Sequence, residues 1–247
     1  MSKSMYLKYL QESGYCVPPF IVLKYIKDFD NFALHLSKNK HFAVRSSANL
    51  EDSAKYSFAG IFETYLNIPH NLLYEYIPKA FDFSKNDNLK KYLDYFQLNS
   101  TLLCMEVVVQ EMINCEKAGV AFSKNPSNGI KETYIEAVWG LGEQCVSGKS
   151  LCDKIRVNNN QTVSYEVGFQ NKMSVCDIQG GITLQDVYLI KQSKRKLSEK
   201  EILSITKVME SLSTEISYGF EIEWGFADGC LYIFQLRPIT ANLSKNS

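Results

Sequence analysis

Four polar residues near the end of the sequence carry side chains of the kinds that bind a metal ion and phosphate. Glu221, Glu223, Gln235 and Arg237 lie in "GFEIEWGFADGCLYIFQLRPIT", which predicts two antiparallel strands joined at 227–229. Side chains alternate along a strand, so all four are expected on one face. Carboxylate and amide oxygens suit Mg²⁺, and an arginine beside them can hold a phosphate oxygen. The residues alone leave open an ordinary solvated face with cross-strand charge pairs.

The loop at 227–229 sets the register that the sequence predicts for this hairpin. Three loop residues, with glycine where a left-handed conformation is wanted, favour closure at Phe226 and Cys230. The further pairs expected from this closure are Glu223 with Ile233 and Glu221 with Gln235. The opposite face is expected to be apolar and to consist of Ile222, Trp224, Tyr232, Phe234 and Leu236.

A serine-rich stretch earlier in the chain offers a second set of phosphate-binding groups. The segment "VRSSANLEDSAKYSFAG" (44–60) has Arg45 at the polar end of the predicted buried strand "HFAVRSS" and ends at Gly60. Its backbone N–H groups and hydroxyls could fold over a polyphosphate, whereas composition alone equally allows a surface loop. Only four of the 27 basic residues are arginine, and a planar two-pronged donor suits phosphate or carboxylate.

Two glycine-containing segments carry weaker signals. "AVWGLGE" (137–143) follows a predicted strand and could bring backbone close to a ligand, but Gly-x-Gly also serves plain turns. "VSGKS" (146–150) resembles the end of a phosphate-binding P-loop. The first glycine of that motif would have to stand at Glu143, and Gly142 lies one residue too early, so a P-loop is not expected.

The elements that must position these residues follow from periodicity and turn signals. Ser198 and Glu201 form a capping-box pattern, and apolar residues then keep a three-to-four spacing from Ile202 to Ile216, which predicts a long helix before Gly219. The β-branched run "LLCMEVVVQEMI" is typical of a central strand, and "AGVAFSKNPSNGIKETYIEAVWG" predicts a hairpin turning at "NPSNG". Further helices are expected at 5–13, 71–83 and 89–98, with an extended segment beginning at the prolines 18 and 19.

Composition narrows the class of protein. The 247 residues are 45% hydrophobic, which excludes disorder, and 27 basic and 27 acidic residues provide no overall field for nucleic acid or a membrane surface. No apolar run approaches the roughly 20 residues of a membrane helix. The first residues lack a secretory signal pattern, so a cytoplasmic location is expected. Seven scattered cysteines, without a CxxC pair, are expected to be reduced thiols.

Three segments, taken in order, resemble one family: the N-terminal nucleotide-binding domain of phosphoenolpyruvate synthase and pyruvate phosphate dikinase, shared with rifampicin phosphotransferase and glutamine kinase-type enzymes. They are "FAVRSSANLEDSAKYSFAGIFETYLNI", "VVVQEMINCEKAGVAFSKNP" with "EAVWGLGEQCVSGKSLCDKIRV", and "YGFEIEWGFADGCLYIFQLRPIT". The resemblance implies an α+β, two-lobed ATP-grasp fold with antiparallel sheets. The lobes are expected at 1–100 and 101–247, without the family's swivelling histidine domain or a separate acceptor domain.

The resemblance also implies roles for individual residues. It implies ATP binding by Lys3, Arg45, Gly60, Thr64, Gln110, Glu111, Met112, Glu223, Gln235 and Arg237. Within that set, Gln110 to Met112 match the strand that meets adenine, and Gly60 and Thr64 match the loop over the terminal phosphates. Mg²⁺ is implied at Glu221, Glu223 and Gln235. Arg45 and Arg237 are expected to be catalytic, because they neutralise charge on the transferred phosphoryl group.

The chain departs from the family pattern at several points. The family's two opening glycines are absent before Lys3, and Glu221 replaces the usual aspartate. Asp87, Asn88 and Leu89 stand where the family often has Asp-Arg-Ala, so one basic contact is expected to be missing. The three histidines, expected to be structural or on the surface, are His35, His41 and His70.

The resemblance implies a Mg·ATP-dependent phosphotransferase that passes a phosphoryl group to a histidine on a partner domain or protein. The dikinases of this family pass a phosphoryl group to histidine and release AMP and phosphate, and the sequence leaves open whether AMP or ADP is the product here. One alternative is a kinase that phosphorylates a small molecule directly and releases ADP. Another is a nucleotide-binding module without turnover. Neither nucleic acid nor a membrane is an expected partner, and the sequence does not identify the final acceptor.

Overall fold

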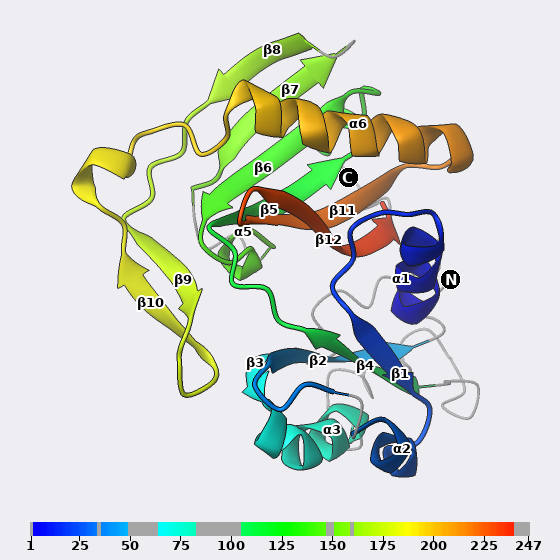
Figure 1. The fold of residues 1–247 in the computed structure, drawn as a ribbon. Coiled ribbons are helices and arrows are strands. Elements are labelled where there is room, and N and C mark those ends of the chain that lie inside the picture. Colours follow the sequence, from blue (N-terminus) through cyan, green and yellow to red (C-terminus); the bar gives the residue numbers. More distant parts are fainter. Residues whose placement is uncertain are drawn as a thin grey trace, which may run out of the picture.

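The computed structural model describes residues 2–33, 36–48, 64–82, 105–146, 151–158 and 161–239. In this part of the chain, two large antiparallel sheets lie one above the other in Figure 1, with helices on their outer faces and helix α1 (Lys3–Glu12) beside the junction. A third, two-stranded antiparallel sheet is formed by residues 172–176 and 182–186. This arrangement confirms the α+β class with two lobes and antiparallel sheets. The predicted helix at 89–98 lies outside the described residues.

The first lobe is a four-stranded sheet covered by short helices. Its strand order is β1 (Phe20–Leu23), β4 (Met105–Glu111), β2 (His41–Ala48) and β3 (Thr64–Pro69). Val107 and Val109 of β4 pack under α3 (Leu73–Phe81), as the β-branched run predicts. The remaining elements of this lobe are η1 (Ile26–Asp28), α2 (Phe29–Ala33) and η2 (His70–Leu72).

The second lobe is a six-stranded sheet with the long helix α6 (Glu199–Glu215) across one face. Its strand order is β12 (Cys230–Pro238), β11 (Phe220–Ala227), β5 (Lys117–Phe122), β6 (Thr133–Trp139), β7 (Asp153–Asn158) and β8 (Gln161–Glu166). The predicted capping box is present, because Ser198 and Glu201 exchange hydrogen bonds at the start of α6. The smaller elements are α5 (Glu143–Val146), β9 (Lys172–Cys176), β10 (Ile182–Asp186) and η4 (Leu189–Lys191).

The chain crosses between the two sheets twice. Helix α1 belongs to the core of the second lobe, where Tyr6 and Leu10 pack with Trp224. The chain then enters the first sheet at β1 and leaves it after β4, between Glu111 and Lys117. Helix α1, which precedes β1, therefore packs on the second sheet, and strand β4, which follows residue 100, belongs to the first sheet. A single cut at residue 100 does not separate the residues of the two sheets.

The predicted register of the terminal hairpin is wrong. Asp228 and Gly229 both have positive φ, +51° and +74°, so the strands join through a two-residue turn and Ala227 pairs with Cys230. Such a turn matches the twist of the flanking strands better than a longer loop. The register then shifts by one residue between Trp224 and Glu223, where Phe234 is the extra residue of a β-bulge.

This bulge changes the two faces of the hairpin. Beyond it, Glu223 pairs with Gln235 and Glu221 pairs with Arg237, so the four polar residues still share a face. On the turn side, Trp224 pairs with Ile233, which is buried in the core in place of the predicted Tyr232 and Phe234. Without the bulge, the two-residue turn would place Phe234 opposite Glu223 and Leu236 opposite Glu221. The bulge shifts the register by one residue, so Gln235 and Arg237 lie opposite the two glutamates instead.

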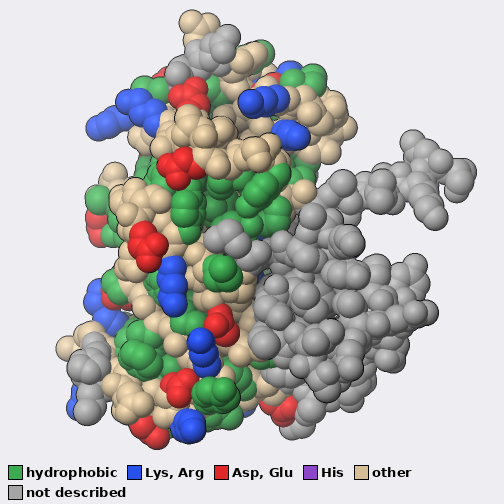
Figure 2. All heavy atoms as spheres, turned by 90° about the vertical axis from the view of Figure 1, so that its right-hand side faces the viewer, with side chains coloured by type: hydrophobic (Ala, Val, Ile, Leu, Met, Phe, Trp, Pro, Cys, Tyr) green, Lys and Arg blue, Asp and Glu red, His purple; other side chains and the backbone are tan. Residues whose placement is uncertain are grey.

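Three properties of the described residues bear on the class of protein. None of their helices combines the length and apolar character needed to cross a membrane. Positive and negative side chains are interspersed over the face seen in Figure 2. No disulfide joins the cysteines of the described part.

Candidate nucleotide site between the two sheets

A cavity of about 590 Å³ lies between the two lobes. Strands β2, β3 and β4 supply one side, and β5, β11, β12 and the loop before α5 supply the other. The predicted residues that line it are Lys3, Arg45, Thr64, Gln110, Glu111, Met112, Glu223, Gln235 and Arg237. Glu221 lies next to the cavity, because it forms an ion pair with the lining residue Arg237. Gly60 lies outside the described residues.

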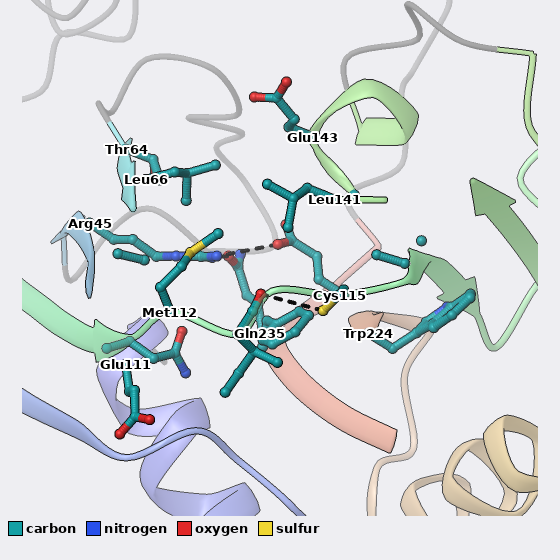
Figure 3. Close-up of a pocket in the computed structure, with 18 of the residues that line it drawn as sticks. Arg45, Thr64, Leu66, Glu111, Met112, Cys115, Leu141, Glu143, Trp224 and Gln235 are labelled. Atoms are coloured by element: carbon teal, nitrogen blue, oxygen red, sulfur yellow. Dashed lines mark hydrogen bonds and ion pairs between the residues drawn. The ribbon is translucent and has the colours of Figure 1, made fainter. Parts of the chain in front are cut away.

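Arg45 connects the two sheets across this cavity. From β2, its Nη1 lies 3.3 Å from Gln235 Oε1 on β12 and 3.5 Å from Glu223 Oε2 on β11. Figure 3 shows the side chain extending across the cavity toward these strands. Its Nε is buried and has no hydrogen-bond partner within the described part of the chain. Arg45 therefore keeps an unused donor next to the carboxylate and amide oxygens.

A second ion pair stands on the same face of the hairpin. Arg237 Nε donates to Glu221 Oε1, and the two residues are directly opposed on β12 and β11. Burial raises the pKa of the Glu221 carboxyl, and Arg237 opposes that shift. Arg45 and Glu223 form the other arginine–carboxylate ion pair, which joins the two sheets. Two arginines thus balance two carboxylates at one end of the cavity.

Lys3 reaches the cavity from the start of α1. Ser2 caps this helix by accepting a hydrogen bond from Met5 N, so the helix begins at Lys3 without a preceding glycine loop. Lys3 Nζ lies 3.4 Å from Ser46 O on β2, next to Arg45 in sequence. Lys3, in the first turn of α1, is therefore the third positively charged side chain at the end of the cavity that holds Arg45 and Arg237.

The other end of the cavity is apolar. Cys115, Ala118 and Leu141 form a buried cluster against which Met112 and Phe234 pack. Met112 and Leu141 point into the same space in Figure 3. This end has the apolar character that suits a flat heterocycle.

The strand residues 110–112 contribute in three different ways. Gln110 is only 1% exposed, and its Nε2 has no partner within the described residues, so a donor is left for a ligand. The Glu111 carboxylate is turned to Lys40 Nζ, 2.5 Å away, and Figure 3 shows it directed away from Met112. The Met112 N–H donates to His41 O, so its side chain rather than its amide faces the cavity.

Sequence reasoning missed part of this lining. Strict alternation assigned Phe234 to the core face, and only the bulge turns it to the cavity. Leu141, Gly142 and Glu143 also line the cavity, and their Gly-x-Gly pattern was the weak signal that could have identified them. Glu143 is held by a 2.7 Å hydrogen bond from Ser174 Oγ on β9. Among the described lining residues none is a histidine.

The donor set fits a hard divalent cation and a polyphosphate. Glu221 and Glu223 provide carboxylate oxygens and Gln235 an amide oxygen, the ligand types that Mg²⁺ takes. The unpartnered Nε of Arg45 stands ready for a further acceptor. An apolar slot that opens on a charged end is the arrangement that a base carrying phosphates requires.

Comparison with known proteins agrees with this geometry. The family model described as pyruvate phosphate dikinase, AMP/ATP-binding domain, matches residues 16–247. A probable phosphoenolpyruvate synthase from Methanocaldococcus jannaschii is 37% identical over 205 residues, 80% of this chain and 17% of its own. A rifampicin phosphotransferase from Bacillus cereus is 29% identical over 220 residues, 87% of this chain and 25% of its own. This chain therefore spans a quarter or less of the length of either relative.

Among solved structures, D-alanyl-alanine synthetase A from Vibrio cholerae aligns with 96% of this chain and 54% of its own. The identity is 12% and the TM-score is 0.46.

Proposed function

Because the chain belongs to the pyruvate phosphate dikinase AMP/ATP-binding domain family, we propose that it binds Mg·ATP between its two sheets and passes a phosphoryl group to a histidine on a partner domain or protein. The observation that carries the proposal is the meeting of Arg45 from one sheet with Glu223 and Gln235 from the other. This contact places cation, carboxylate and amide at the point where a polyphosphate would lie.

The polarity of the cavity supports one orientation of the proposed nucleotide. The adenine ring fits the apolar end, between Met112, Leu141 and Phe234. Gln110 lies beside it with an unsatisfied amide donor, which suits a ring nitrogen of the base. The phosphates then extend toward Arg45 and Arg237, and Lys3 approaches from α1.

Binding requires the charged residues to exchange partners. In this structure Arg45 and Arg237 are paired with Glu223 and Glu221. A polyphosphate competes for the two guanidinium groups, because they form strong charge-assisted bonds to phosphate oxygens. Mg²⁺, when bound, would be held by the released oxygens of Glu221 and Glu223 with Gln235, and would offset charge on the phosphates. Arg45 and Arg237 can then stabilise charge on the phosphoryl group as it transfers.

In this proposal the acceptor lies on another domain or another chain. Two observations support it: the described lining holds no histidine, and the two relatives named above are several times longer than this chain. A dikinase-type transfer to histidine releases AMP and phosphate, whereas direct transfer to a small molecule releases ADP. The proposed lobes at 1–100 and 101–247, with α1 packing on the second lobe and β4 pairing in the first sheet, would serve either reaction, in the cytoplasm where ATP is available.

The first test is calorimetric titration of the purified chain with ATP, with and without Mg²⁺. We expect Mg²⁺-dependent binding that is lost in Arg237→Ala and Glu223→Gln and kept in Arg195→Ala, whose side chain is 58% exposed on the surface. No binding by folded wild-type chain would contradict the proposal at its first step. Identification of AMP or ADP after incubation with a co-encoded histidine protein then separates the two transfer reactions. Turnover without a phosphohistidine would overturn the histidine route.

A further inference from the structure

Two cysteines meet beside the wall of the cavity. Cys145 Sγ in α5 lies 3.0 Å from Cys152 Sγ, which immediately precedes β7. Cys145 is buried against Val120 and Val138, while Cys152 is only partly buried. The two sulfur atoms are in direct contact, with a partly solvent-accessible thiol next to a buried one.

This contact is linked to the cavity through α5. The helix begins at Glu143, which lines the cavity, and Cys145 N donates to Gly142 O at 3.0 Å. Beneath the pair, Val120 on β5 stands opposite Glu223 in the sheet register. A covalent bond between the sulfurs would therefore tie segment 141–146, which includes cavity-lining residues, to the residue that immediately precedes β7.

We propose that Cys145 and Cys152 are a reversible disulfide-forming site that responds to peroxide. The site does not depend on the proposed ATP binding. A disulfide requires sulfurs about 2.05 Å apart, so closure from 3.0 Å needs a shift of only about 1 Å, which side-chain rotation in a short helix can supply.

The chemistry balances with a peroxide as the two-electron oxidant. The Cys152 thiolate attacks one peroxide oxygen, the O–O bond breaks, and a sulfenic acid and hydroxide form; the hydroxide takes a proton to become water. The Cys145 sulfur then attacks the sulfenic sulfur, the S–S bond forms, and a second water leaves with the Cys145 proton. Two thiols and one hydrogen peroxide become one disulfide and two waters.

The surroundings support this order of attack. The hydrogen bond between the Cys145 and Cys152 sulfurs lowers the pKa of Cys152, and the positive charges of Lys196 and Lys154 act in the same direction. The same hydrogen bond, with burial, raises the pKa of Cys145. Cys152 is also the more exposed of the two thiols, so it is the one that a peroxide reaches first.

A soft metal ion is the competing use of this cluster. The Glu136 carboxylate lies near both sulfurs, with the three ligand atoms within 4.8 Å of one another. Two thiolates on one tetrahedral zinc ion stand about 3.8 Å apart, given Zn–S bonds of about 2.3 Å. The observed separation of 3.0 Å is shorter than that, and only three protein ligands are present among the described residues. The geometry therefore favours the S–S bond.

The test is peptide mapping of the whole chain after treatment with a small excess of hydrogen peroxide. Trypsin cuts after Lys149, so the two cysteines fall in different peptides, and the disulfide joins 132–149 to 150–154. We expect this linked pair in wild type, its loss in Cys145→Ser and Cys152→Ser, and its return to two free peptides with dithiothreitol. Cys230→Ser, which removes an exposed thiol elsewhere, should keep the linked pair.

Two further readouts decide the matter even where a variant folds poorly. Hydrogen exchange on wild type should show several-fold slower exchange at the amides of 141–146 after oxidation, because the disulfide then anchors this segment at Cys145. Over-oxidised, unlinked Cys152 would overturn the proposal. A zinc ion bound to the untreated chain would also overturn the proposal, if native mass spectrometry detects it and it protects both thiols from peroxide.

Discussion

Arg45 Nη1 and Glu223 Oε2 lie 3.5 Å apart although the two residues belong to different sheets, on β2 and β11. Their side chains are 14% and 19% exposed, so the pair is largely screened from solvent. Without ligand, the cavity therefore contains its own counter-charges. If ATP binds as proposed, its affinity depends on how well phosphate replaces the carboxylate at each arginine.

Replacement of Arg45 should weaken ATP binding more than it weakens the fold. Arg45→Ala removes charge-assisted bonds, each contributing about 1.5–3 kcal/mol, so we expect at least about tenfold weaker binding. Arg45→Lys keeps the charge but not the two-pronged geometry, so its affinity for ATP should lie between those of wild type and Arg45→Ala. Calorimetric titration measures the affinity, and thermal unfolding checks the fold. Unchanged affinity in folded Arg45→Ala would remove Arg45 from the site.

Phe234 should contribute to nucleotide affinity from its bulge position. Phe234→Ala removes an aromatic side chain from the apolar end of the cavity and should weaken ATP binding by about 1 kcal/mol, roughly fivefold. Phe169→Ala is the matched control, because Phe169 is 51% exposed and does not line the cavity. Equal affinities of the two variants would show that the base lies elsewhere.

A buried ion pair at the start of β7 should dominate the stability of the second lobe. Lys196 Nζ and Asp153 Oδ1 are 2.6 Å apart, and both side chains are fully buried. Lys196→Met leaves the Asp153 charge without its partner and should lower the free energy of unfolding by about 3–5 kcal/mol. Urea unfolding measures the change, with the exposed Lys200→Met as control. A loss no larger than that of the control would contradict this assignment.

The Glu132–Arg156 pair should make the protein acid-sensitive. The hydrogen bonds from Arg156 lower the pKa of the Glu132 carboxyl below its ordinary value, despite the opposing effect of burial. For a lowered carboxyl pKa, the stabilisation is present above the unfolded-state pKa and is lost as pH falls through the folded-state pKa. Thermal unfolding between about pH 6 and pH 3 should therefore show a smaller fall in Tm for Glu132→Gln than for wild type. Parallel curves would contradict the prediction.

Local signals predicted most of the elements, because each depends on residues close in sequence. The capping box at Ser198, the central strand at 105–111 and the hairpin turning near 125–129 all formed where the patterns placed them. The two lobes and the antiparallel pairing followed from the family resemblance. Nothing in the helical and strand periods showed that α1 packs on the last strand, since this contact joins opposite ends of the chain.

The candidate site was predictable in its polar half and not in its apolar half. Glu223, Gln235 and Arg237 share a face in the predicted register and also in the observed one, because the bulge offsets the effect of the shorter turn. Phe234 could not be assigned, because a one-residue bulge reverses the side to which a strand residue points, and its position depends on packing rather than on local sequence. The ligand roles of all these residues stay predictions that the titrations test.

The double crossing between the sheets has a mechanical consequence. The outgoing and returning segments run antiparallel and are hydrogen-bonded where they enter the first sheet, with Phe20 paired to Gln110 and Glu111 N bonded to Pro19 O. The two crossings therefore form one hydrogen-bonded connection between the lobes. Any change in the angle between the lobes would have to bend both segments together.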